Sequence, residues 1–204
     1  MKELISPPKL YSRIEILSKP SPIPNIHGVY GWFFKEIPSL VPSDGCIKHK
    51  GLILLYVGIS PDKECKPNSK QDLKKRIICH YRGNAESSTL RQSLGVLLKE
   101  KSGHPLRRVG SGKRMTFTHV GEQWLNDWME RNAFVCWVEH KTPWELEEKL
   151  LHSLSLPLNI KGNRHRPFAV ELGRLRKKAR AQARELPIEN QGNQQRQGRY
   201  TYLR

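Results

Sequence analysis

Three short segments rich in apolar, aromatic and β-branched residues constrain the fold of this chain most strongly. They cover residues 26–34, 52–58 and 133–139, and each has the length of a β-strand. The proline, aspartate and glycine residues between the first two segments favour a long hairpin loop. Leucines at helical spacing follow the second and the third segment. The sequence therefore predicts an α/β (α+β) domain in which helices flank a small sheet.

The clearest helix start in the sequence lies at Thr142. Thr142-Pro143-Trp144-Glu145 has the pattern of a capping box with proline at the first helical position, and this helix should end before Pro157. Residues 102–114 are expected to be a loop. Further helices are expected at residues 69–81, with Ser69 as N-cap, and at 88–100, 122–131 and 169–186, with a short strand at 116–118.

The length of 204 residues suits one domain, and composition divides the chain further. The proline-rich residues 1–25 should form an extended N-terminal arm. Residues 26–160 should form the α/β domain, and residues 161–186 a basic helical extension. Residues 187–204 are rich in Gln, Asn, Arg and Gly, which predicts a disordered tail.

The cysteines and the N-terminus bear on the compartment. The four cysteines show neither a CxxC pair nor the spacing of zinc ligands. The first residues do not resemble a signal peptide, and no apolar stretch is long enough to span a bilayer. We therefore expect a soluble, cytoplasmic protein with no membrane partner.

A formal net charge of +17 indicates a polyanionic partner. Nucleic acid is the first candidate and an anionic membrane surface the second, while a solubility device or a ribosome-associated basic protein is the less specific alternative. The positive charge is concentrated in residues 61–114 and 160–204, on either side of an acidic stretch at 115–159. Two basic regions could thus hold a phosphate backbone beside carboxylates that bind a metal.

The candidate DNA-backbone contacts lie in a glycine-rich loop and on the C-terminal helix, and a solvated charged face is the alternative. They are Arg107, Arg108, Lys113, Arg114, Arg174, Arg176, Lys177, Lys178 and Arg180. The segment Arg164-His165-Arg166 either lines a cleft or caps the core.

Glu147 occupies an unusual position in the helix that starts at Thr142. At about 100° per residue, Leu146, Leu150, Leu151 and Leu154 form one apolar stripe, and Glu147 falls inside it. A carboxylate among core-facing leucines is costly unless a cation or a functional cleft compensates. The alternative is a glutamate at the edge of the stripe that reaches solvent or pairs with an arginine.

Two further features are weak when taken singly. Arg76 and His80 lie four residues apart on one side of a predicted helix, where they could bind a phosphate or form ordinary surface. Tyr30 and Tyr56 lie in predicted strands, where tyrosine is usually structural.

Taken together, these elements resemble the GIY-YIG nuclease superfamily of homing, repair-incision and restriction-type endonucleases. The resemblance covers about residues 26–160, and both tripeptides carry Val where the family name has Ile. It implies a three-stranded, mostly antiparallel sheet flanked by helices, here followed by a basic C-terminal helix. The elements that carry it, in chain order, are Gly28-Val29-Tyr30, Tyr56-Val57-Gly58, Arg76, His80, Glu147 and Asn159.

The resemblance implies a role for each residue on the strands and the first helix of the site. Tyr30 would assist deprotonation of the attacking water, directly or through a neighbour, and Tyr56 would hydrogen-bond the scissile phosphate or the water. Arg76 would neutralise charge on the pentacovalent transition state. His80 takes a position that is Tyr or His in relatives.

The resemblance also implies a metal site. Glu147 would hold one divalent ion, Mg²⁺ or Mn²⁺, in each active site, and Asn159 would position the site through hydrogen bonds. One departure concerns phosphate contacts, because some relatives carry Lys or Arg just after the second tripeptide and this chain has Ile59-Ser60. Candidates to replace that residue are Lys63, Lys66 and Lys70.

The sequence thus predicts a metal-dependent DNA endonuclease of restriction, repair or structure-specific type. The alternatives are a non-catalytic nucleic-acid-binding module and an RNA-directed nuclease, which would share the same site residues. A homodimer is expected if both strands of a palindromic site are cut, because one metal and one set of residues serve one strand.

Overall fold

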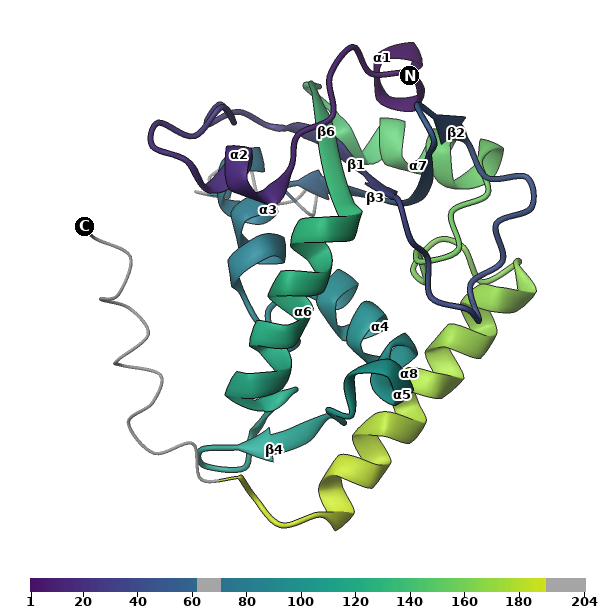
Figure 1. Cartoon of the computed structure of the whole chain (residues 1–204). Coiled ribbons are helices and arrows are strands. Elements are labelled where there is room, and N and C mark those ends of the chain that lie inside the picture. The colour runs from purple at the N-terminus through teal and green to yellow at the C-terminus, as the bar shows by residue number, and fades with distance from the viewer. Residues whose placement is uncertain (62–70, 190–204) are drawn as a thin grey trace.

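A four-stranded antiparallel sheet lies at the centre of the protein (Figure 1). The structure is a computed structural model that describes residues 1–61 and 71–189. The sheet order is β2-β3-β1-β6, and its longer strands are β1 (Gly28–Phe34), β3 (Leu52–Ser60) and β6 (Ala133–Glu139). All seven residues of the central strand β1 are buried. This double-sided burial explains why β1 is an unbroken apolar run rather than an alternating one.

The predicted count of three strands was wrong, because the sheet has a fourth strand, β2 (Lys48–His49). It pairs with Ile53 and Leu52 of β3 and lies at the edge of the sheet. Two polar residues inside a loop give no periodic signal, so the sequence pattern could not reveal this strand. Since β2 covers only the start of β3, the rest of β3 is left for other segments to pair with.

Helices cover both faces of this sheet and carry most of the site residues. They are α1 (Lys2–Ile5), α2 (Arg13–Leu17), α3 (Leu73–Arg82), α4 (Thr89–Leu97), α5 (Lys99–Ser102), α6 (Thr118–Asn132), α7 (Pro143–Ser153) and α8 (Pro167–Glu185). Among the residues that the structure describes, no helix is long and apolar enough to cross a membrane.

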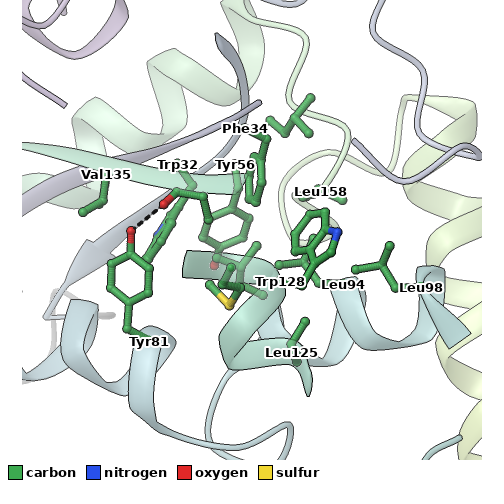
Figure 2. Packing of buried hydrophobic residues seen from close by; sticks show 14 of the residues in the cluster. Trp32, Phe34, Tyr56, Tyr81, Leu94, Leu98, Leu125, Trp128, Val135 and Leu158 are labelled. Atoms are coloured by element: carbon green, nitrogen blue, oxygen red, sulfur yellow. Dashed lines mark hydrogen bonds between the residues drawn. The ribbon is translucent and has the colours of Figure 1, made fainter. Parts of the chain in front are cut away.

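The side chains of β1 point alternately into two hydrophobic clusters. Tyr30, Trp32 and Phe34 face the larger cluster, where α2, α3, α4, α6 and α8 pack (Figure 2). Val29 and Phe33 face the smaller cluster, which α1 and α7 complete. Helices α3 and α7 therefore cover opposite faces of the sheet.

Helix α3 begins at Leu73, later than the sequence predicted. Its N-cap is Asp72, whose carboxylate accepts a hydrogen bond from the Lys75 backbone N–H at 2.7 Å. The predicted cap Ser69 lies outside the described residues.

The capping box predicted at the start of α7 does not form. Helix α7 does begin with Pro143 after the N-cap Thr142. However, the Thr142 backbone N–H donates to His140 Nδ1 at 3.2 Å, so it is not available to the Glu145 carboxylate. Glu145 instead accepts a hydrogen bond from the Thr142 hydroxyl at 3.0 Å.

The segment predicted as a loop at 102–114 contains part of a small hairpin. Its strands are β4 (Arg107–Val109) and β5 (Arg114–Thr116), which pair antiparallel. Gly110 and Gly112 have φ of +60° and +80° and so provide the left-handed backbone of the turn. Three-residue strands rich in arginine carry too little apolar pattern to be predicted. Helix α6 starts at Thr118, four residues before the predicted start at residue 122.

The N-terminal residues are not extended throughout, because they include the short helices α1 and α2. Leu4 and Ile16 are fully buried, and Tyr11 forms a bridge with Val135 of β6. Ser12 and Glu15 form a capping box at the start of α2. The prolines of this segment thus separate short helices that pack against the sheet.

Candidate active site

One cavity of about 690 Å³ collects most of the predicted site residues. Tyr30, Tyr56, Arg76, Glu147 and Asn159 line it, and they come from β1, β3, α3, α7 and the loop that follows α7. The structure thus brings together groups separated by more than a hundred positions in the chain. Other lining residues are Thr89, Trp144, Glu148, Arg164 and Arg176.

The edge of β3 that β2 leaves unpaired explains how groups from opposite faces of the sheet meet. The loop after α7 runs along this part of β3, where the Leu158 N–H donates to the Leu55 carbonyl at 3.0 Å. Leu156 belongs to the smaller cluster and Leu158 to the larger one, so this loop passes from one face to the other. The cavity is correspondingly lined both by Tyr56, from the larger cluster, and by Ile59, from the smaller.

Asn159 holds the loop after α7 against β3 at the point where the loop passes from one face of the sheet to the other. Its side-chain oxygen accepts from the Val57 N–H at 2.9 Å, and its Nδ2 donates to the Val57 carbonyl at 2.8 Å. The amide therefore satisfies both backbone groups that Val57 directs away from β1, on the side where β3 has no strand partner at this position. Because Val57 follows Tyr56 directly, this pair of bonds also holds the Tyr56 backbone in place.

The glycine of the second tripeptide makes room for Tyr30. Gly58 lies opposite Tyr30 in the β1–β3 register. A Cβ atom at Gly58 would stand 2.4 Å from the Tyr30 hydroxyl, which is far inside contact distance. The tyrosine ring therefore crosses over a position where no side chain can stand, and its hydroxyl reaches the cavity.

Arg76 and His80 contact the Tyr30 hydroxyl from α3. Arg76 Nε donates to this hydroxyl at 3.4 Å, and Arg76 Nη1 donates to the Ser87 carbonyl at 3.2 Å. His80 does not line the cavity but lies behind Tyr30, fully buried, with Nε2 at 2.8 Å from the same hydroxyl. His80 Nδ1 is 2.7 Å from the Ser88 hydroxyl oxygen.

The direction of the bond between Tyr30 and His80 depends on which ring nitrogen of His80 carries the proton. With that proton on Nδ1, the Tyr30 hydroxyl accepts from Arg76 and donates to His80 Nε2. The Nδ1–H group then donates to Ser88, and this assignment is made from the network of partners. Burial, and after it Arg76 and Arg91, hold the pKa of His80 well below 6.5, so the ring is neutral.

Both tyrosines of the site are neutral phenols. Burial raises the pKa of Tyr30 well above 10, and neighbouring Tyr56 adds to this effect while Arg76 opposes it. Burial likewise raises the pKa of Tyr56, which a hydrogen bond to Thr89 partly offsets. Arg76 alone therefore does not turn Tyr30 into an ionised base.

Glu147 adds a carboxylate to the same cavity, and Glu148 lines it as well. The Glu147 charge raises the pKa of both Tyr30 and Tyr56, which indicates that it acts on both phenols. No cluster of three or more His, Cys, Asp or Glu side chains occurs within residues 1–61 and 71–189. A divalent ion here would thus have few protein ligands, and water and substrate oxygens would complete its shell, as Mg²⁺ prefers.

Several of the predicted DNA-backbone contacts hold the end of α8 instead. Arg107 pairs with Glu189 at 2.6 Å and donates to the Pro187 carbonyl at 3.0 Å. Arg108 donates to the carbonyls of Ala183 and Leu186, at 3.3 and 2.9 Å. Carbonyls in the last turn of a helix have no partner within it, so both arginines satisfy groups at the α8 terminus.

The remaining basic candidates differ in their surroundings. Arg174 pairs with Glu171 at 2.7 Å, and Arg176 and Arg180 contact Gln92. Lys113 and Arg114 in the hairpin and Lys177 and Lys178 on α8 are exposed, and their side chains have no hydrogen bond or ion pair among the described residues.

Two open questions from the sequence concern cavity residues. Of the segment 164–166, Arg164 lines the cavity, whereas Arg166 donates to the Leu154 carbonyl at 3.0 Å. Lys63, Lys66 and Lys70 lie outside the described residues.

Sequence reasoning did not identify Thr89, and it placed Arg176 on a DNA clamp rather than in the cavity. Thr89 follows the N-cap of α4 and gives no sequence signal of its own. The only signal for Arg176 was its positive charge on a basic helix, which does not distinguish it from its neighbours.

Fold and cavity together define a small α+β domain whose cleft combines two phenols, a guanidinium and a carboxylate, groups suited to phosphate chemistry. The family model described as GIY-YIG catalytic domain matches residues 28–178, and the chain belongs to that family. Membership confirms the predicted superfamily and indicates a nuclease. Comparisons with curated proteins and with solved structures gave no match.

Proposed function

We propose that this protein is a metal-dependent endonuclease that hydrolyses phosphodiester bonds of DNA. The observation that carries the proposal is that Tyr30, Tyr56, Arg76 and Glu147 line one cavity although they come from four different elements. Hydrolysis of a phosphodiester requires activation of water, a cation facing the phosphate and relief of charge on the leaving oxygen. Each requirement has a candidate group in this cavity.

Arg76 is the candidate for charge neutralisation on the transferred phosphoryl group. Its hydrogen bonds to Tyr30 and to the Ser87 carbonyl use Nε and one N–H of Nη1 and hold the guanidinium in one orientation. The remaining N–H groups are free to meet phosphate oxygens, and a fixed guanidinium loses little entropy when it does so.

Water activation is assigned to Tyr30 acting through His80. A neutral phenol cannot take a proton unless it gives one away, and Tyr30 donates to His80 Nε2 at 2.8 Å. As the attacking water loses its proton to the Tyr30 oxygen, the phenol proton passes to His80 Nε2, while Nδ1–H remains bonded to Ser88. Because the pKa of His80 lies well below 6.5, the ring is unprotonated at neutral pH and its Nε2 can serve as the acceptor. The same burial and neighbouring arginines disfavour the imidazolium, so the proton must leave His80 again within the reaction.

Glu147 is the candidate ligand for one Mg²⁺ or Mn²⁺ per site. A cavity that Glu147 and Glu148 share with arginines and phenols fits a site in which water and phosphate oxygens supply most of the coordination. The ion would supply Lewis-acid stabilisation of the leaving oxygen.

The net charge of +17 supports DNA as the substrate. Lys113 and Arg114 of the hairpin and Lys177 and Lys178 of α8 are exposed and remain candidate backbone contacts. Arg107 and Arg108 are weaker candidates, because their guanidinium groups already bond to carbonyls at and just after the end of α8.

The test is cleavage of supercoiled plasmid by the full chain, with Mg²⁺ and with EDTA, beside a Glu147→Ala variant. Mg²⁺-dependent nicking or discrete fragments are expected, and the variant should lose cutting while it still binds DNA. Glu145→Ala is the matched control, because Glu145 is exposed on the same helix and does not line the cavity.

Two other outcomes would replace this proposal. Cleavage of RNA but not of plasmid or branched DNA would indicate an RNA-directed nuclease. DNA binding without cleavage under any divalent metal would indicate a non-catalytic binding module. Equal cutting by Glu147→Ala and by wild type would contradict the assignment of the metal ligand.

A further inference from the structure

Two arginines of α8 converge on one neutral side chain of α4. Arg176 donates from both Nε, at 3.0 Å, and Nη2 to Gln92 Oε1, and Arg180 Nη2 donates to the same oxygen at 3.3 Å. Gln92 is 1% exposed, and α8 runs beside α4 at this point (Figure 1). A single amide oxygen thus accepts hydrogen bonds from two guanidinium groups one helical turn apart.

No carboxylate in the described part of the chain forms an ion pair with either arginine. Like charges four residues apart on a helix repel each other, and Gln92 accepts their hydrogen bonds without neutralising them. Burial, and after it the charge of Arg180, lowers the pKa of Arg176. The contact therefore keeps an uncompensated positive charge in a half-buried position.

Arg176 also lines the cavity that contains Tyr30, Tyr56 and Arg76. The bonds to Gln92 use its Nε–H and one Nη2–H, so three of its five N–H groups remain. Arg180 is exposed and is not among the residues that line the cavity. Arg176 is thus a third guanidinium of the candidate active site beside Arg76 and Arg164, and it comes from the opposite end of the chain to Tyr30.

We propose that Arg176 binds a phosphate of the substrate strand inside this cavity, and that Gln92 is its positioning residue. The proposal rests on the proposed function, because it names a substrate contact of that same site. An oriented guanidinium fork matches two phosphate oxygens, and an anion would relieve the repulsion between Arg176 and Arg180. A glutamate at position 92 would have cancelled that charge, whereas glutamine orients the arginines and leaves the charge for the substrate.

The competing explanation is that the Arg176–Gln92 contact only docks α8 on α4. The two explanations differ in the salt dependence of binding, since a protein loses about 0.9 from the slope of log K against log salt for each phosphate contact removed from B-DNA. A purely structural contact would lower the melting temperature instead.

The experiment measures binding of the full chain to a fluorescein-labelled DNA duplex by anisotropy, in EDTA and over a series of KCl concentrations. Arg176→Ala should weaken binding by about 10- to 100-fold at low salt and lower the slope by about one phosphate equivalent. Arg131→Ala is the matched control, because Arg131 is exposed on α6 and does not line the cavity. It should keep the wild-type slope.

Gln92→Glu provides a second variant that does not depend on truncation. Its carboxylate would pair with both arginines and would replace Nε2, which has no hydrogen-bond partner within the described residues. This variant should bind DNA as weakly as Arg176→Ala while its melting temperature is equal to or higher than that of wild type. Wild-type affinity for Gln92→Glu, or equal slopes for Arg176→Ala and Arg131→Ala, would overturn the proposal.

Failure of the proposed function is recognised separately. Wild type that binds DNA but cuts nothing would remove the nuclease assignment, and the slopes would still decide whether Arg176 contacts phosphate. Wild type that binds neither DNA nor RNA would overturn both proposals.

Discussion

At the scale of single residues, the Tyr30 hydroxyl is the centre of the candidate site. It accepts from Arg76, lies 2.8 Å from His80 Nε2 and occupies the space that Gly58 leaves open. The Tyr30 phenol and the His80 imidazole are both buried and neutral. Burying this pair costs little free energy, because each group is hydrogen-bonded and neither carries a charge. Arg76, at the rim of this network, carries the charge that faces the cavity.

Buried neutral His80 predicts a specific pH dependence of stability. The pKa of His80 in the folded protein lies well below 6.5, whereas an unfolded histidine titrates at about 6.5. Below about pH 6.5 only the unfolded state takes up this proton, so stability is fully present above that pH and is lost as the pH falls toward the folded pKa. The contribution is at most about 1.4 kcal/mol per pH unit. Urea unfolding at a series of pH values from neutral to mildly acidic measures it.

His80→Asn is the control for this prediction, because Asn keeps a donor and an acceptor but does not titrate. As the pH falls, the free energy of unfolding of the variant should decrease less steeply than that of wild type. The difference between the two slopes should be at most that of one proton, about 1.4 kcal/mol per pH unit. All other titratable groups are the same in both proteins, so the comparison isolates position 80. Identical slopes would show that His80 is protonated in the folded state.

The residues of the site differ in how far the sequence could reveal them. Tyr30, Tyr56, Arg76 and Glu147 were selected because each lies in a local pattern, a strand tripeptide or a helix face, and these patterns come in a family-like order. The contact of Arg176 with Gln92 joins residues 84 positions apart, and neither residue lies in a motif. Only the packing of α8 on α4 brings them together, and no pattern in a single sequence predicts which helices pack against each other.

At the scale of elements, apolar runs predicted the three long strands, but local capping patterns were less reliable. Strand β6 occupies the predicted residues 133–139, where aromatic and β-branched side chains dominate and no proline or glycine interrupts the run. Helix α7 was predicted to have a capping box at Thr142, and a tertiary hydrogen bond to His140 occupies the backbone donor that this box requires. Tertiary contacts override such local patterns when a better-placed acceptor lies nearby.

The two helix starts give a matched prediction for stability. Asp72 caps α3 through the Lys75 N–H at 2.7 Å and also pairs with the Lys75 ammonium at 3.1 Å. Asp72→Ala should therefore lower the free energy of unfolding by about 1 kcal/mol, within the range for lost N-caps of about 0.5–2 kcal/mol. Thr142→Ala, which removes no side-chain cap, should cost less than about 0.5 kcal/mol. Urea unfolding of both variants checks the difference, and equal losses would contradict the assigned caps.

At the scale of the whole molecule, the basic residues divide into two groups that sequence cannot separate. Arg107 and Arg108 donate to carbonyls at and just after the end of α8, and Arg107 also pairs with Glu189. These contacts connect the β4–β5 hairpin to that helix (Figure 1). Lys113 and Arg114, in the same hairpin, are exposed. All four carry the same charge and lie within eight residues of the sequence, so a net charge of +17 overstates the charge that is free to meet DNA.

A pair of double variants distinguishes the two groups. Arg107→Ala with Arg108→Ala removes three hydrogen bonds to the end of α8 and the residues just after it. At about 0.5–1.5 kcal/mol per bond, the protein should lose roughly 1.5–4.5 kcal/mol of stability. Lys113→Ala with Arg114→Ala removes no side-chain hydrogen bond or ion pair of the described structure, so the melting temperature of this variant should stay near that of wild type. If both residues contact phosphate, the slope of log K against log salt should fall by up to about 1.8. Thermal unfolding and anisotropy over a KCl series give both quantities.

The comparison is informative because the two variants lose the same formal charge from one hairpin. Long-range attraction for DNA therefore falls equally in both, and any difference between their salt slopes measures direct contact. The Arg107 and Arg108 pair should change the slope less, because its guanidinium groups already have partners in the free protein. A larger slope change for Arg107→Ala with Arg108→Ala would mean that DNA displaces the end of α8 when it binds. The hairpin would then contact the DNA backbone with the same arginines that bind α8 in the free protein.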